Sequence, residues 1–575
     1  MRKSGVRFVP GILLVRSYRR VHARADLVAG LGLIALLVPQ GMAYATLAGL
    51  PPVTGLYTTV TALFAYAVFG PSRILVLGPD SALGPLIAAA VLPLVGSGGD
   101  PATAVELAGL LALLMGALCL AAGFLHLGVL AELFSKPVRI GFLNGIAIVV
   151  FVGQLPHLFG FSSTAQGLAD EATAFARGVR DGQTVIASLL IGLGVLAVIL
   201  VLRSVRPGMP GVFVALVGAA VATAVFDLTT RGVAVVGAIP SGLPAPTFPH
   251  VGLADVGALL VAAAGMAFVA LTDTAVLSRS FAAKRGEHFD ADQEIVALGA
   301  ANIAAGMFQG FPVSASASRT AVAEASGSRT QMTGVVGAIG IVVVLVAVPG
   351  LGTYLPTAAL AAVIISASLA LFDFRSSLWL WHVRRSECLL SVGALLGVAV
   401  LGVLPGIAVA IALSLGDFVR RAWRPYDAVL GRIPGRKGYH DIDRHPEAQQ
   451  IPGLVLVRFD APLFFANANL FANRVISAID NRNEKIQWVI VAAEPITDID
   501  TTAAEALDEL LDNLQSRGVE LAFAELKGPV KDELARYDLS ERIGDNHLFP
   551  TLGTAISGYL AATGTLWTDW SDRQP

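Results

Sequence analysis

The chain has 575 residues, of which 55% are hydrophobic and only 14% are charged. Its mean hydropathy of +0.70 lies well above that of a soluble domain, so the composition indicates an integral membrane protein. The net charge of −2 gives no sign of nucleic-acid binding, and two cysteines within apolar runs, Cys119 and Cys388, indicate neither a disulfide framework nor a metal site.

Residues 1–24 contain seven basic residues around a short apolar run, GILLV. This run is too brief for the core of a signal peptide. We interpret residues 1–24 as a basic arm in the cytoplasm.

Apolar segments recur from about residue 27 to residue 425, separated by glycine, proline and clusters of charge. We predict fourteen transmembrane segments, two of them short, in an α-helical transmembrane domain of residues 25–425. The predicted segments are 27–48, 53–70, 81–96, 103–125, 137–157, 183–203, 210–226, 253–281, 292–309, 316–325, 330–349, 355–372, 386–402 and 405–423.

Positive charges test the topology, because short cytoplasmic loops collect lysine and arginine. With the N-terminus inside, basic residues close the even-numbered segments, and Arg231 after the seventh is the main exception. We therefore expect a multi-pass protein of the cell (inner) membrane with both termini in the cytoplasm. The supporting residues are Arg73, Lys136, Arg139, Arg203, Arg206, Arg279, Lys284, Arg285, Arg329, Arg384, Arg385, Arg420, Arg421 and Arg424.

Fourteen segments divide as seven plus seven, and an odd-numbered repeat inserts its second copy upside down. The third and tenth segments then correspond, and both are short and follow a Gly/Pro-marked approach, at 74–84 and 310–320. Such a pair is typical of a transporter's binding site at the bilayer midplane, and two facing helix N-termini favour an anion. The alternative is that both are ordinary loops with short helical caps.

The tenth segment contains Arg319 after a run of small and hydroxyl residues. An arginine at membrane depth costs about 2.5–3.5 kcal/mol on insertion scales, so a chain that keeps one usually uses it. A helix starting near Ser316 would direct its free backbone N–H groups to the same point as the guanidinium, which predicts an anion site. Alternatively, Arg319 extends to the membrane interface or pairs with Glu324.

Polar residues also interrupt the first segment, in the sequence PQGMAY. Gln40 can donate and accept hydrogen bonds in a cavity, and Tyr44, one turn later, would share its face. The alternative is that the amide only joins neighbouring helices.

The eighth segment carries Asp273 between two threonines. A carboxylate within the membrane is a candidate for handling a proton or a cation. Its protonation would depend on whether an anion neutralises a nearby Arg319. The alternative is a static ion pair between Asp273 and Arg319.

After Tyr426 the sequence becomes polar. We predict a linker at 426–450, then a small α/β domain at 451–565 from alternating strand-like and helix-like runs, and a tail at 566–575. This domain is expected in the cytoplasm.

Within that domain, Thr501 is a weak candidate for a phosphorylation or contact point before a predicted helix. A capping box of Thr502 with Glu505 explains the same residues without regulation.

Three stretches resemble the sulfate permease family, solute carrier family 26. They are PQGMAYATLAGLPPVTGLYTTV (39–60), GPSRILVLGPDSA (70–82) and DADQEIVALGAANIAAGMFQGFPVSASASRTAVAEASGSRTQ (290–331). The tail resembles the STAS domain that this family shares with anti-sigma-factor antagonists. The resemblance covers nearly the whole chain and is greatest to actinobacterial sulfate permeases.

This resemblance implies seven-plus-seven inverted repeats arranged as core and gate domains, an elevator-like movement, a homodimer and an anionic substrate. It places Gln40 and Tyr44 in the wall of the anion site, Ala82 at the third segment's helix start, and Ser318 with Arg319 as a Ser-Arg pair. Together with the helix start predicted from the residues, the predicted anion site is Gln40, Tyr44, Ala82, Ser316, Ser318 and Arg319.

Asp273 matches an acidic position of proton-coupled plant sulfate transporters and of sodium-coupled bicarbonate transporters. The bicarbonate branch has threonines where this chain has Leu277 and Ala317. Losing two hydroxyl ligands disfavours a sodium site, so we expect Asp273 to handle a proton.

In the tail, DTTA (500–503) stands where antagonists have a phosphorylatable Asp-Ser pair, which keeps Thr501 a weak candidate.

We therefore expect a secondary active transporter that couples sulfate uptake to protons. The alternatives are a bicarbonate or dicarboxylate symporter or anion exchanger and, from another class, an anion channel or a voltage-responsive motor. The sequence has no Walker-type loop and no HExxH, CxxC or GxSxG motif, so neither ATP-driven transport nor an enzyme is expected. The expected partners are an inorganic anion, protons, membrane lipids and a second copy of the chain, with no cofactor, metal or nucleic acid.

Overall fold

The computed structural model describes residues 9–11, 18–96, 99–128, 135–163, 165, 167–206, 209–238, 240, 242–249, 252–287, 289–347 and 349–567. The remainder of the predicted basic arm and of the predicted tail lies outside these residues. The chain divides into two compact units, Met1–Ser414 and Leu415–Pro575, and each is described by itself.

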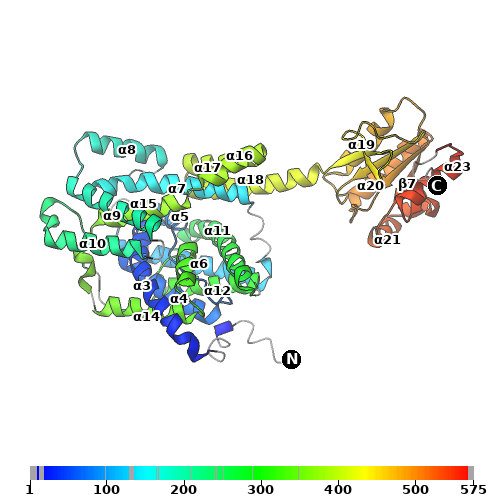
Figure 1. Cartoon of the computed structure of the whole chain (residues 1–575). Coiled ribbons are helices and arrows are strands. Elements are labelled where there is room, and N and C mark those ends of the chain that lie inside the picture. The colour runs from blue at the N-terminus through cyan, green and yellow to red at the C-terminus, as the bar shows by residue number, and fades with distance from the viewer. Residues whose placement is uncertain are drawn as a thin grey trace. The chain divides into compact units, whose positions relative to one another are not determined.

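The first unit is built from helices (Figure 1), and a helix overlaps each predicted apolar segment. These helices are α3 (Arg20–Leu47), α4 (Pro52–Phe69), α5 (Gly84–Val95), α6 (Pro101–Phe124), α7 (Lys136–Phe159), α9 (Ile186–Val205), α10 (Gly211–Val225), α11 (Leu253–Arg285), α12 (Ala291–Met307), α13 (Ala317–Ala325), α14 (Met332–Ala347), α15 (Thr357–Leu371), α17 (Arg385–Leu401) and α18 (Val403–Trp423), within which the division between the two units falls. Between them lie α8 (Leu168–Arg180), α16 (Phe374–Val383) and two 3-10 turns, η2 (Leu228–Arg231) and η3 (Pro349–Tyr354).

Eight helical stretches of the described residues are long and apolar enough to cross a membrane, and α5, α10 and α14 are shorter apolar helices. The eight stretches lie in α3, α4, α6, α7, α9, α11, the α15–α16 region and α18. A helix crosses the bilayer core because it satisfies its backbone hydrogen bonds internally. The first unit is therefore a helical membrane domain, whereas the number of spans and the inverted repeat stay predictions.

The helices form two packing groups. In the first group, α12 packs against α4 and α6, α14 packs against α3 and α4, and α11 packs against α6. In the second group, α7 packs against α15 and α17, and α9 packs against α10 and α15. The groups meet where α3 contacts α10 and α15.

Two strands of two residues each lie within the first group, β1 (Leu77–Gly78) and β2 (Ser314–Ala315). They pair antiparallel, with Leu77 opposite Ala315 and Gly78 opposite Ser314, and all four residues are buried. Helix α5 follows the first strand and α13 follows the second. The predicted third and tenth segments therefore begin close to one another.

The second unit contains a six-stranded sheet of order β4-β3-β5-β6-β7-β8. Strands β5 to β8 run parallel, and β3 is antiparallel to both of its neighbours. The strands are β3 (Asp427–Arg432), β4 (Tyr439–Asp441), β5 (Leu454–Phe459), β6 (Trp488–Ala492), β7 (Glu520–Ala524) and β8 (Leu548–Phe549).

Helices cover both faces of this sheet (Figure 1). One face packs against α19 (Ala468–Asp480), α20 (Thr501–Ser516), α21 (Gly528–Arg536) and α22 (Leu539–Ile543), and the other against α23 (Leu552–Thr563). A 3-10 turn, η4 (Asp545–His547), precedes β8. This arrangement is the predicted small α/β domain.

The region predicted as a linker, 426–450, differs from that prediction. It contributes β3 and β4 to the six-stranded sheet, because Val429 pairs with Val457 and Leu430 pairs with Asp441. These strands are not predicted from the sequence, because the segment is polar and contains glycines, which is typical of a linker.

Close helix contacts in the first unit depend on glycine, and the crossing of α3 and α4 provides a test. A Cβ atom at Gly55 would lie 1.9 Å from the Gly41 carbonyl oxygen, so the helices would have to separate. We expect Gly55→Ala to lower the unfolding free energy by about 1–3 kcal/mol. The measurement is the thermal unfolding midpoint of the purified protein in detergent.

The matched control is Gly153→Ala in α7, where a Cβ would meet nothing within 4 Å. This substitution should leave the midpoint unchanged or raise it, because alanine favours helix more than glycine does. Equal effects of the two variants would contradict the packing of α3 on α4.

Candidate functional site

Hydrogen bonds from side chains and from neighbouring backbone stabilise the strand pair β1–β2, in addition to the hydrogen bonds between the two strands. The Ser316 N–H donates to the Val76 carbonyl at 3.1 Å, and the Val76 N–H donates to the Thr320 hydroxyl at 3.1 Å. The Asn302 amide donates to the Val313 carbonyl at 3.2 Å and accepts from the Val313 N–H at 2.9 Å. Non-helical backbone at membrane depth needs such partners, because no water satisfies it there.

Arg319 is fully buried beside this strand pair. Its Nη2 donates to the Pro79 carbonyl at 2.6 Å, whereas Nε and Nη1 have no hydrogen-bond partner among the described residues. A Cβ atom at Gly78 would lie 3.0 Å from Nη1, so glycine lets the guanidinium lie against the strand. Two unpartnered buried donors on a cation are a site with unused capacity for an anion or a water molecule.

The two alternatives for Arg319 are wrong. A fully buried side chain does not reach a membrane interface. Glu324 lies 3.8 Å from Lys284, with which it forms an ion pair, and no such pair with Arg319 is present in the described part of the chain.

A cavity of about 510 Å³ lies beside this region. Gln40 and Tyr44 of α3 line one side, and Ser316 and Ser318 at the start of α13 line another. The remaining wall comes from Asp80 and its neighbour after β1 and from residues of α9, α10 and α15. The cavity is therefore located where the two helix groups meet.

Four of the six predicted anion-site residues thus share one cavity, whereas Ala82 and Arg319 are buried next to lining residues in the chain and do not line it themselves. Helix α5 begins at Gly84, two residues after Ala82. The Ala82 N–H donates to the Asp80 carboxylate at 2.9 Å, so this amide is already occupied. At the other helix, Ser316 is the N-cap of α13, and its hydroxyl accepts from the Arg319 N–H, which agrees with the predicted helix start.

Three polar residues of the cavity wall are not among the predicted site residues. Asp80 and Ser81 lie in the GPDSA motif that carries the family resemblance, and Arg203 lies in the last turn of α9. The sequence signal for Asp80 was a carboxylate within an apolar stretch. From the sequence, Arg203 is expected only as a positive charge that closes the sixth segment on the cytoplasmic side.

Asp273 lies in α11 and forms an ion pair with Arg139 of α7, with Oδ1 and Nη1 3.9 Å apart. The alternative of a static ion pair between Asp273 and Arg319 is therefore wrong. Asp273 is not in the cavity wall. Because α7 and α11 belong to different helix groups, its ion pair connects the groups.

Two other carboxylates in the first unit are buried and satisfied by neutral donors. Asp26 accepts from the N–H groups of Arg329 and Thr330 at 2.8 and 3.0 Å, just before α14, and from two threonine hydroxyls. Glu294 accepts from the Tyr66 hydroxyl at 2.7 Å and from the Ser278 hydroxyl. These contacts join α3 to the start of α14 and α12 to α4 and α11.

In the second unit, Thr501 is the exposed first residue of α20. The cap of this helix is Asp500, whose carboxylate accepts from the Ala503 N–H and the Phe465 N–H, both at 2.8 Å. The predicted capping box of Thr502 is therefore wrong, because the aspartate two residues earlier satisfies the helix start.

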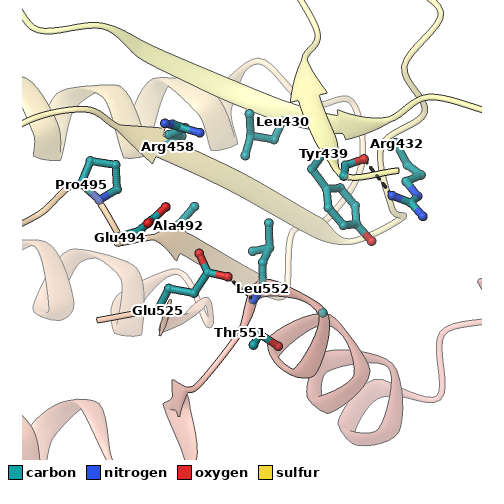
Figure 2. Close-up of a pocket in the computed structure, with 12 residues that line it drawn as sticks. Leu430, Arg432, Tyr439, Arg458, Ala492, Glu494, Pro495, Glu525, Thr551 and Leu552 are labelled. Carbon is teal, nitrogen blue, oxygen red and sulfur yellow. Dashed lines mark hydrogen bonds between the residues drawn. The ribbon is translucent and has the colours of Figure 1, made fainter. Parts of the chain in front are cut away.

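A second cavity, of about 430 Å³, lies at the carboxyl ends of parallel strands in this unit (Figure 2). Arg458, Glu494, Glu525 and the N-cap residue Thr551 line it. Arg458 is paired with Asp460 at 2.6 Å. This cavity is not predicted from the sequence, because its residues come from segments that are far apart in the chain.

Comparison with known proteins gives the family. The model of the sulfate permease family matches residues 24–394, and that of the STAS domain matches residues 445–555. The chain belongs to the sulfate permease family. A probable sulfate transporter of Mycobacterium tuberculosis is 41% identical over 552 residues, which cover 96% of this chain and 98% of the relative. Sulfate transporter 4.1, chloroplastic, of Arabidopsis thaliana is 32% identical over 559 residues, or 94% of this chain and 81% of the relative.

Solved structures confirm the fold of this permease. Murine solute carrier 26 family member A9, an anion transporter solved in the inward-facing state, superposes with a TM-score of 0.89 at 22% identity over 98% of this chain and 96% of that one. The transmembrane domain of the cyanobacterial bicarbonate transporter BicA gives 0.60 at 24% identity over 68% of this chain and 98% of that one. The permease thus has the helical membrane fold of these transporters. Its family and its relatives, which are named as sulfate transporters, identify it as a transporter with a C-terminal STAS domain and not as an enzyme.

The hydrogen bond from Val76 to Thr320 allows a test of how the strand pair is held. Thr320→Val keeps the shape of the side chain but leaves the buried Val76 N–H without its acceptor, which costs about 1–3 kcal/mol. We expect a lower thermal unfolding midpoint for the purified permease. Thr320→Ser, which keeps the hydroxyl, is the control, and a valine variant as stable as the serine variant would refute the contact.

Proposed function

We propose that this permease is a secondary active transporter that takes up sulfate together with protons. The observation that supports it is the buried Arg319, with two unpartnered donors, directly behind a cavity with polar walls. We propose that the anion is held in this cavity by Gln40, Tyr44, Ser316 and Ser318, with Arg319 supplying positive charge from behind and Ala82 supporting the approach to α5.

Sulfate has two negative charges and only acceptor atoms. Hydroxyl and amide donors at the wall replace part of its hydration shell, and the start of α13 adds the positive end of a helix. A guanidinium that does not touch the anion still lowers its free energy, because screening by water is weak in a buried site. These features favour a small anion over a cation.

We propose an elevator-like movement in which the first helix group acts as a core and the second as a gate. The cavity lies between the groups, which is where alternating access needs it. The ion pair between Asp273 and Arg139 connects the groups, so protonation of Asp273 would release Arg139 and lower the barrier to movement. This is the role we propose for Asp273 in proton coupling.

We also propose that the permease is a homodimer in the cell (inner) membrane with cytoplasmic termini. Arg203 and the start of α10 belong to the cavity wall. The positive-charge pattern predicts that the turn between α9 and α10 is cytoplasmic. This combination supports a cavity that opens towards the cytoplasm. The STAS domain is proposed to lie in the cytoplasm, with Thr501 as a weak regulatory candidate.

The first functional test is uptake by purified permease in liposomes. We expect radiolabelled sulfate to accumulate when an inward proton gradient is imposed and to stop accumulating when a protonophore collapses it. Flux that is indifferent to pH would remove the proton-coupling proposal.

The same assay separates the substrate alternatives. Bicarbonate, oxalate and a longer dicarboxylate are added as competitors of radiolabelled sulfate, and unlabelled sulfate should compete best. Stronger competition by bicarbonate or a dicarboxylate would indicate that this anion is the substrate. An ion flux far above the turnover rate of a carrier would indicate a channel.

The second functional test addresses Arg319. Arg319→Gln removes the charge, and the loss of its Coulomb attraction for the anion should weaken sulfate binding by roughly tenfold or more. Isothermal titration calorimetry on the detergent-solubilised protein measures the affinity. The control is Arg177→Gln in α8, an exposed arginine, which should bind like the unmodified protein. Unchanged affinity in Arg319→Gln, with normal thermal stability, would refute the site.

A further inference from the structure

The cavity wall contains a carboxylate that an anion site does not obviously need. Asp80 lies directly after β1, is partly exposed, and faces the same space as Tyr44, Ser316 and Ser318. Its Oδ1 accepts from the Ala82 N–H at 2.9 Å. An ionised carboxylate in this position repels an anion in the cavity, and the repulsion is stronger than in bulk water because low-dielectric protein surrounds the cavity.

One cation acts on Asp80, and a second lies in the same cavity wall. The Arg319 guanidinium is anchored on the carbonyl of the preceding residue, Pro79, and lies within electrostatic range of the Asp80 carboxylate. Arg203 contributes to the same cavity wall from α9. Neither forms an ion pair with Asp80 within the described residues, so the negative charge of Asp80 is only partly offset.

The other ionisable groups that face Asp80 are Tyr44 of α3 and Asp273 of α11. Tyr44 is neutral at ordinary pH. Asp273 is paired with Arg139 and lies outside the cavity wall. The remaining buried carboxylates of this unit, Asp26 and Glu294, are bound by neutral donors on other helices. Among the described residues, Asp80 is therefore the carboxylate that meets the cavity.

We propose that Asp80 makes anion binding in this cavity depend on the proton concentration. This inference deepens the proposed function and rests on it. When Asp80 is ionised, it opposes a dianion; when it is protonated, its O–H becomes a donor to the anion. The proton comes from the water on the side to which the cavity opens and returns to water on the side where the anion leaves.

The two aspartates then have separate tasks. Asp80 couples the proton to the affinity for the anion, whereas Asp273 acts on the movement of the helix groups. By linkage, sulfate binding favours proton uptake by Asp80 to the same extent that the proton favours sulfate binding. Sulfate affinity therefore rises as pH falls, by at most tenfold per pH unit for one proton. It becomes constant at a pH low enough that Asp80 is protonated both with and without bound sulfate. A monovalent anion has half the charge, so its affinity changes over a narrower pH range.

The experiment is sulfate binding by isothermal titration calorimetry to the purified full-length permease, from about pH 5 to pH 8. Asp80→Asn keeps an oxygen that accepts from the Ala82 N–H but has no charge to titrate. We expect this variant to bind sulfate with an affinity that does not change with pH and that exceeds that of the unmodified protein at pH 8 by about tenfold or more. In liposomes, it should exchange sulfate but not accumulate it under a proton gradient.

Three further variants sharpen the test. Asp80→Glu keeps a titratable group and should keep a pH-dependent affinity. Ser81→Ala, next to Asp80 in the wall, and Asp273→Asn should both keep the pH dependence of binding. Asp80→Ser replaces Asp80→Asn if the latter has reduced thermal stability, because serine also presents an acceptor.

The outcomes distinguish this inference from the proposed function. Unmodified protein that binds no sulfate at any pH overturns the proposed function and this inference with it. Sulfate binding whose pH dependence survives in Asp80→Asn, or disappears in Asp273→Asn, overturns the role of Asp80 alone.

Discussion

The structure of the membrane domain depends on one constraint: extended backbone at membrane depth must find hydrogen-bond partners. The pair of β1 and β2 satisfies a few of these groups, and side chains satisfy others. Thr320 accepts from Val76, and Asn302 both accepts from and donates to Val313. Because these partners come from α12 and α13, the strand pair exists only when the first helix group is assembled. This brings the starts of two short helices, α5 and α13, to one place inside the protein.

The same constraint explains why Arg319 is where it is. Its Nη2 satisfies the Pro79 carbonyl, which ends the extended segment after β1, while the other donors of the guanidinium stay without a partner in the described residues. One side chain therefore both supports the non-helical backbone and places positive charge behind the cavity. Small residues complete the arrangement, since Gly78 leaves space for the guanidinium and Gly55 lets α4 lie against α3.

Buried carboxylates in this domain divide by the chemistry of their partners. Asp26 and Glu294 are enclosed by hydroxyl and N–H donors and connect helices. Asp273 has a cation, Arg139, on the other helix group. Asp80 meets the cavity itself. We propose that a proton on Asp80 sets the charge of this cavity, which is the property that proton-coupled uptake of an anion requires.

Much of the fold and part of the site could be predicted from the sequence alone. Hydropathy is a local property that adds up along a segment, so the apolar segments and the membrane class could be predicted. The α/β tail could be predicted from its alternating strand-like and helix-like runs. Motifs around residues 39–60 and 290–331 predicted the family, and the Gly/Pro-marked approaches predicted that segments three and ten lie together. Side-chain partners could not be predicted in this way, because they depend on distances between segments far apart in the chain. Only the tertiary structure decided that Asp273 pairs with Arg139, that Asp500 caps α20, that residues after Tyr426 join a sheet, and that Asp80 shares the cavity with Tyr44 and Ser318.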